Sequence, residues 1–261
     1  MKFVLSKKTL PVFFVLSLSL THCGAPEEES PPSALPSLSV RDCKASAGGC
    51  DQRVTLARLT EARNQLQKWS ALESQKSIYY SESLVPLPLD GTVKALNKNN
   101  FNNIYGRGYY HWILRKSAKF VQILFPGRFV TVLRVDSNYP YSNPLQQEDA
   151  HGHGLDADIG YILLNPDDPT SPIDLEAQFW FTYMMYSEAA LVTGHRYSGF
   201  SYIHEVESTL YQAKAAGLVE STFNFSKMLD PWEFYHVSHF HFGIQECPRT
   251  LVRTNQGPRC Q

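Results

Sequence analysis

The chain has 261 residues, a formal net charge of −1 and a hydrophobic fraction of 43%. This length allows one domain with a sizeable core once an N-terminal segment is removed. Nucleic-acid binding needs a basic face, which this charge balance does not favour, so we expect no nucleic-acid partner.

Residues 1–22 have the features of a signal peptide. Lys2, Lys7 and Lys8 form a basic stretch, and the apolar run that follows is too short to span a membrane. The next residues, Leu20-Thr21-His22-Cys23-Gly24, resemble the lipobox of bacterial lipoproteins, so we expect Cys23 to be acylated. His22 departs from the pattern, because lipoboxes have a small residue at that position. The alternative is a plain secretory signal in which Cys23 is incidental.

Residues 23–50 are rich in proline, glutamate and serine and bury little apolar surface, so we expect them to form a disordered tether. A single domain is then predicted over residues 51–261. Together, these features predict an exported protein, periplasmic or held at a membrane by its N-terminal lipid.

Helices are predicted where apolar residues recur at three- and four-residue steps. Four segments show this spacing: 54–75, 109–121, 175–192 and 205–216. Asp174 can cap the third segment, and Gly194 can end it. Because that segment is apolar nearly all round, we expect it to be the buried central helix.

Strands are predicted in runs of aromatic and β-branched residues. These runs lie at 129–135, 155–164, 200–203 and 234–244, and residues 85–103 are predicted to be loop or short strand. The expected fold is α+β, with a small antiparallel sheet flanked by helices.

Four cysteines remain besides Cys23, an even number that in an exported chain is typical of two disulfide bonds. They are Cys43, Cys50, Cys247 and Cys260. Three pairings are possible. The local one, Cys43–Cys50 with Cys247–Cys260, needs no assumption about the fold, and bonds between the N-terminal segment and the C-terminus are the alternative.

Histidines and carboxylates gather in two distant segments, 151–158 and 236–241. Side chains at i and i+2 of a strand share a face, so Asp156 is expected to face the same way as Asp158, and His239 the same way as His241. Burying carboxylates beside imidazoles is costly unless a cation lies between them. The pattern therefore predicts one metal site on the sheet, and zinc takes three such ligands and leaves a position for water.

The two segments resemble the penicillin-insensitive murein endopeptidases, zinc metallopeptidases of the lysostaphin, D-Ala-D-Ala metallopeptidase and hedgehog-like group. The match comprises four motifs in the order of the family: His151-x-x-Gly154-Leu155-Asp156-x-Asp158-Ile159, Pro231-Trp232, His236-x-x-His239-x-His241 and Cys247-Pro248. The combination is specific, whereas a His-x-His pair alone occurs in many folds.

The resemblance implies Zn²⁺ held by His151, Asp158 and His241, with His239 as the catalytic histidine. It implies hydrolysis of the peptide cross-links of peptidoglycan at D-Ala-type bonds.

Three nearby residues would have supporting roles. Asp156 would accept a hydrogen bond from the second ring nitrogen of a ligand histidine, or would have a purely structural role in a turn. The remaining roles fall to His236, which would bind substrate or brace the site, and to Trp232, which would stack on substrate or lie in the core.

Two positions depart from the family pattern: Glu148 replaces a histidine, and His153 replaces a small polar residue. Two alternative functions remain open. One is a D-Ala-D-Ala or L,D-type carboxypeptidase of the same group, and the other is a surface lipoprotein that binds peptidoglycan or a host protein without turnover. No His-Glu-x-x-His, Gly-x-Ser-x-Gly or P-loop sequence occurs.

Overall fold

The computed structural model describes residues 53–95, 104–135, 154–194, 204–223, 239–244, 246–247 and 250–261. The predicted signal peptide, lipidation site and tether lie outside these ranges, as do Cys43, Cys50 and the predicted strand at 200–203. Helices and small sheets in the described ranges form an α+β fold, which confirms the predicted class.

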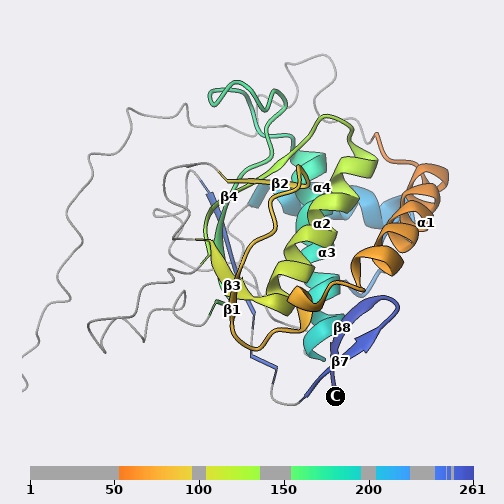
Figure 1. Ribbon diagram of the computed structural model, residues 1–261. Helices are drawn as coiled ribbons and strands as arrows, with labels where there is room; N and C mark the ends of the chain where they lie inside the picture. Colours follow the sequence, from red (N-terminus) through yellow and green to blue (C-terminus); the bar gives the residue numbers. More distant parts are fainter. Residues whose placement is uncertain are drawn as a thin grey trace, which may run out of the picture. The chain divides into compact units, whose positions relative to one another are not determined.

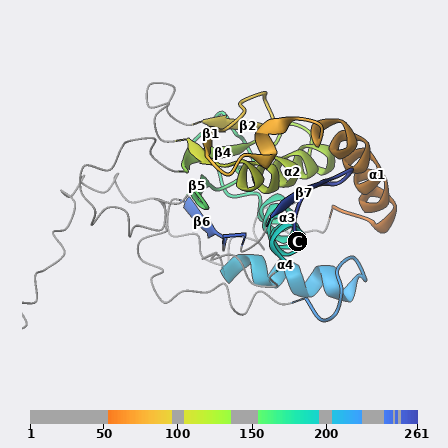
Figure 2. The same cartoon turned by 60° about the horizontal axis from the view of Figure 1, so that its bottom comes forward.

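Helices α1 to α4 pack in chain order, each against the next (Figure 2). Their bounds are Leu56–Glu73, Gly108–Leu124, Leu175–Thr193 and His204–Ala215. The apolar spacing predicted all four to within three residues at either end. Nearly every residue of α3 is buried, which confirms that it is the central helix.

The ends of α3 follow the predicted signals. The Asp174 carboxylate accepts a hydrogen bond from the Ala177 N–H, 3.2 Å away, which caps the first turn. Gly194 ends the helix with a left-handed φ of 76°, a conformation that glycine adopts without steric cost.

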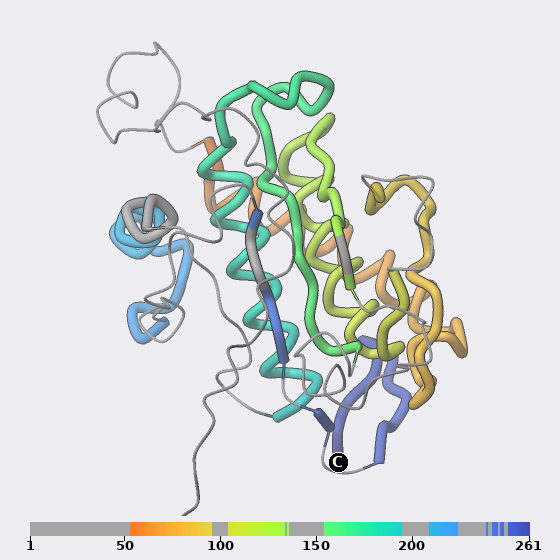
Figure 3. Tube along the Cα trace, turned by 90° about the vertical axis from the view of Figure 1, so that its left-hand side faces the viewer, coloured from red at the N-terminus to blue at the C-terminus, as the bar shows by residue number. Residues whose placement is uncertain are grey.

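A four-stranded sheet has the order β2-β4-β5-β6, with bounds Val93–Ala95, Val130–Arg134, Asp156–Gly160 and His239–Gly243. Figure 3 shows β5 running between β4 and β6. The last three strands are antiparallel, as predicted, whereas β2 runs parallel to β4 and makes the sheet mixed. The Phe242 ring of β6 packs edge-on against Tyr186 of α3, so this end of the sheet rests on the central helix.

Strand β5 is shorter than the predicted 155–164 because the chain finds other partners after Gly160. The Ile162 N–H donates to Gln178 Oε1 at 3.0 Å, and the Ile162 carbonyl accepts from the Asp174 N–H at 2.7 Å. The start of α3 thus takes over the backbone hydrogen bonds that a neighbouring strand would supply.

Two smaller antiparallel pairs complete the described strands. One joins β1 (Leu84–Pro86) to β3 (Tyr105–Arg107), and the other is a hairpin of β7 (Leu251–Thr254) and β8 (Gly257–Cys260). The hairpin packs against α1, α2 and α3 through β8 (Figure 1). The sequence did not predict it, because Pro258 interrupts the strand pattern.

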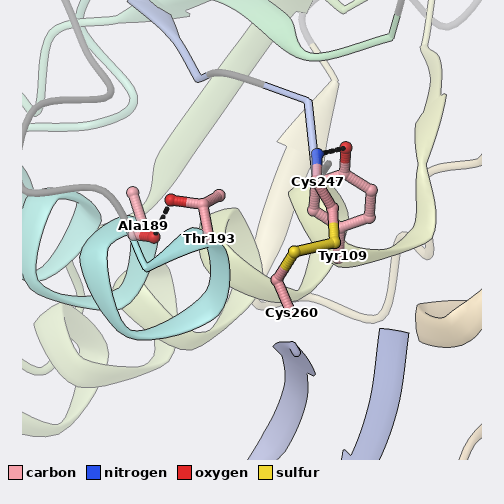
Figure 4. The surroundings of a disulfide bond; sticks show 5 residues. All are labelled: Tyr109, Ala189, Thr193, Cys247 and Cys260. Atoms are coloured by element: carbon pink, nitrogen blue, oxygen red, sulfur yellow. Dashed lines mark hydrogen bonds between the residues drawn. A yellow bond between two sulfur atoms is a disulfide. The ribbon is translucent and has the colours of Figure 1, made fainter. Parts of the chain in front are cut away.

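A disulfide bond joins Cys247, just beyond β6, to Cys260 in the hairpin, with 5.8 Å between their Cα atoms (Figure 4). The Cys247 N–H donates to the Tyr109 hydroxyl of α2 at 3.2 Å. Of the pairings that the sequence allowed, the structure thus contains the local C-terminal bond. It ties the chain that leaves β6 to the end of the domain.

Charged side chains are buried between the helices. Arg115 of α2 is fully buried and pairs with Glu73 and Asp90. The next residue of α2, Lys116, pairs with Glu188 of α3, with 2.6 Å between nitrogen and oxygen. These pairs were not predicted, because charged side chains usually lie at the surface.

None of the helices in the described part of the chain combines the length and the apolar character needed to cross a membrane.

Glu176 fixes the first described residues to the start of α3. It is buried, with 8% of its surface exposed. Its carboxylate accepts from the Arg53 N–H at 2.9 Å, from Arg53 Nε at 2.9 Å and from the Val54 N–H at 2.9 Å. Arg53 also pairs with Asp174. These bonds hold the chain immediately before α1 against the central helix.

We expect Glu176→Gln to lower the free energy of unfolding by about 2 kcal/mol, because the amide removes a charge that several donors share. Urea unfolding measures the loss. Glu61→Gln is the control, since Glu61 is exposed on α1, and it should change stability by less than about 0.5 kcal/mol. Equal effects of the two substitutions would contradict a role for Glu176 in fixing this segment.

Candidate metal site

Strands β5 and β6 bring together the two distant segments that the sequence singled out. Their antiparallel register sets Asp158 opposite His241, Gly160 opposite His239 and Asp156 opposite Gly243. Residues 156, 158 and 160 therefore share a face of the sheet with residues 239, 241 and 243. On the other face, Ala157, Ile159 and Phe242 are fully buried in the core.

The type of backbone pairing follows from one hydrogen bond beyond the strand ends. The Ile244 N–H donates to the Leu155 carbonyl at 2.8 Å, so these opposite residues form a hydrogen-bonded pair. Because the two pair types alternate along antiparallel strands, Asp158 and His241 form a non-hydrogen-bonded pair, whose Cα atoms lie about 4.5 Å apart. This is the closer of the two spacings and suits two residues that share one ligand.

His239 and Asp158 approach each other diagonally across the two strands. Nε2 of His239 lies 3.5 Å from Oδ1 of Asp158, and each side chain is 20% exposed. An imidazole and a carboxylate therefore meet at a partly exposed point of the sheet, where water can reach both.

Asp156 lies deeper than Asp158, with 4% of its surface exposed. Its carboxylate covers Gly243: a Cβ atom added to that glycine would lie 3.2 Å from Asp156 Cγ and 3.3 Å from Oδ1. A side chain at 243 would therefore press on the carboxylate. The glycine two residues after His241 was a sequence signal for this arrangement that the prediction did not use.

The other predicted site residues are placed only in part. His151, His236 and Trp232 lie outside the described ranges, and only the backbone of His241 lies within them. Among the side chains that are described, no three from His, Cys, Asp and Glu gather closely enough to hold a metal ion. Of the expected site, the described side chains thus include one ligand, the Asp158 carboxylate, and the expected catalytic imidazole of His239, 3.5 Å from it.

Tyr110 of α2 reaches this region from the core and was not predicted to take part. Its hydroxyl donates to the Phe242 carbonyl at 2.6 Å, between His241 and Gly243 in the chain. Burial, together with the nearby charges of Asp156 and Asp158, raises the pKa of Tyr110 well above its usual value. The hydroxyl therefore keeps its proton and remains a donor.

His111, the next residue along α2, belongs to the core. It is fully buried, and its Nε2 lies 2.8 Å from the Val85 carbonyl, to which it donates. Its Nδ1 has no hydrogen-bond partner among the described residues. Burial lowers the pKa of His111 to about 4, because it disfavours the charged imidazolium. Protonation of Nδ1 would also create a buried N–H donor without an acceptor among the described residues.

This shift predicts that acid destabilises the protein through His111. The folded-state pKa of about 4 lies below the unfolded value of 6.5. Between these values only the unfolded chain takes up the proton, so stability falls as the pH drops from 6.5 towards 4. At pH 5 the loss is about 2 kcal/mol. We expect His111→Gln to remove this part of the pH dependence, measured as the free energy of unfolding in urea at pH 5 and 7.5. An equal loss of unfolding free energy between pH 7.5 and pH 5 in the two proteins would contradict the prediction.

No protein-family model matches the chain. No curated protein matches its sequence either. Function is therefore inferred from the residues of this chain and from the geometry that β5 and β6 give them.

Proposed function

We propose that the protein is a zinc-dependent murein endopeptidase that hydrolyses D-Ala-type peptide cross-links of peptidoglycan. The observation that carries the proposal is the β5–β6 register, which sets Asp158 opposite His241 and leaves His239 3.5 Å from Asp158. These are the residues in which the sequence motifs resemble that family.

In this proposal His151, Asp158 and His241 hold the metal. Bound zinc would supply a Lewis acid that activates water and polarises the scissile carbonyl. His239 takes the proton from the attacking water at its imidazole and returns it to the leaving amine. Its partial exposure next to Asp158 supports this role, because a proton carrier must reach solvent and substrate.

The residues around this centre have supporting roles. Asp156 orients a ligand histidine through its second ring nitrogen, and its burial over Gly243 supports a fixed position for the carboxylate. His236 and Trp232 contact the substrate, His236 by hydrogen bonding and Trp232 by stacking on it.

Export and lipidation at Cys23 complete the proposal, because a membrane tether would hold the domain beside peptidoglycan. Metabolic labelling with a radioactive fatty acid tests this: the full chain should take up label, and Cys23→Ala should not. Label in both proteins, or in neither, would contradict lipidation at Cys23.

Digestion of purified murein tests the enzyme activity. With zinc present, mass spectrometry of the digest should show cross-linked dimers converted to monomers. Loss of one terminal alanine would instead identify a carboxypeptidase, and sedimentation with murein without cleavage would identify a binding protein. Cleavage that persists in zinc-free protein would overturn the proposed chemistry.

A further inference from the structure

The backbone of β6 is held at Phe242 from two helices. The Phe242 ring packs against the ring of Tyr186 of α3, with 5.3 Å between ring centroids and 84° between ring planes. Its carbonyl accepts the 2.6 Å hydrogen bond from Tyr110 of α2. Both groups at Phe242 are buried, so both contacts are shielded from water.

Phe242 lies between the two positions of β6 that face the carboxylates of β5. The residue before it, His241, is opposite Asp158, and the residue after it, Gly243, is opposite Asp156. A displacement of the backbone at Phe242 would therefore change both cross-strand pairs together. β5 has strands on both sides, whereas β6 is the last strand of the described sheet and has β5 alone as a neighbour.

We propose that Tyr110 is a positioning residue: its hydroxyl fixes the backbone of β6 at Phe242 and so sets the distance between the metal ligands on β5 and β6. The inference rests on the proposed zinc site. Groups that orient metal ligands from outside the coordination sphere usually change metal affinity by roughly 10- to 100-fold when they are removed.

The same helix offers a matched control. Tyr109 also uses its hydroxyl in a backbone contact, accepting from the Cys247 N–H at 3.2 Å. That contact lies four residues beyond β6, outside the paired segment. Tyr109→Phe therefore removes an equivalent hydroxyl next to Tyr110 without touching the strand that carries the histidines.

The test compares wild-type protein, Tyr110→Phe and Tyr109→Phe in three measurements. These are zinc affinity by competition with a chromophoric chelator, the visible absorption spectrum after cobalt substitution, and the melting temperature of the zinc-free protein. Phenylalanine keeps the ring, so each variant should melt only about 2–4 °C below wild type. Zinc binding should weaken by roughly 10- to 100-fold in Tyr110→Phe alone, with a changed cobalt spectrum.

Each outcome separates the two proposals. If wild-type protein binds no zinc, the proposed function fails. If wild-type protein binds zinc and Tyr110→Phe matches it in affinity and cobalt spectrum, the positioning role is overturned. The role is also overturned if both variants weaken zinc binding equally, or if Tyr110→Phe does not fold, because the hydroxyl would then serve the fold in general.

Discussion

His239→Ala protein should bind zinc as tightly as the wild type and hydrolyse murein cross-links roughly 10²- to 10⁴-fold more slowly, the usual contribution of a positioned proton carrier. The expectation follows from the division of roles on β6, where His241 lies opposite Asp158 and His239 lies opposite Gly160. Removing a ligand should have a different result. His241→Ala or His151→Ala protein should lose both zinc and hydrolysis.

Zinc content by elemental analysis and the rate of dimer cleavage separate the two classes of variant. Lys68→Ala serves as the control, because Lys68 is exposed on α1 and should leave both quantities unchanged. Loss of zinc from His239→Ala would make His239 a ligand. Full activity in that variant would remove it from the catalytic mechanism.

Arg115→Met should lower the free energy of unfolding by about 3–5 kcal/mol, because it leaves a buried carboxylate without its partner. Arg115 is fully buried, and Glu73, with which it pairs, is 7% exposed. Glu73 also accepts from Lys76 Nζ at 2.8 Å and from the Tyr79 hydroxyl. Methionine fills much of the same volume but leaves the Glu73 carboxylate buried without its main cation.

A double-mutant cycle in urea tests this explanation. Glu73→Gln in the Arg115→Met background should restore part of the lost stability, because it removes the uncompensated charge. Lys68→Met, an exposed change of the same kind, should shift stability by less than about 0.5 kcal/mol. Additive effects of the two buried substitutions would show that the pair is not coupled.

The helices and the faces of the site strands could be predicted because they depend on local patterns. Apolar spacing located α1 to α4, and Asp174 and Gly194 marked the ends of α3. The alternation of side chains along a strand placed Asp156 and Asp158 on one face of β5. The register puts positions 239 and 241 of β6 on the same face of the sheet. These features need only the periodicity of a helix or a strand.

Other features depend on contacts that no local pattern encodes. The parallel pairing of β2 with β4 joins segments on either side of a helix. The burial of Arg115 depends on Glu73 of another helix, and the role of Tyr110 depends on its reach to a carbonyl 132 residues away. In the β7–β8 hairpin, Gly257 takes a φ of 111° and packs where any Cβ would collide with Trp112, a constraint visible only in three dimensions.

The central claim is that β5 and β6, together with His151, hold one divalent ion. Diffraction from crystals of the zinc-loaded protein, recorded on both sides of the zinc absorption edge, tests it most directly. We expect one anomalous peak per chain, with a nitrogen of His151, a nitrogen of His241 and a carboxylate oxygen of Asp158 each about 2.0–2.2 Å away. No peak, or a peak bound by other side chains, would contradict the claim.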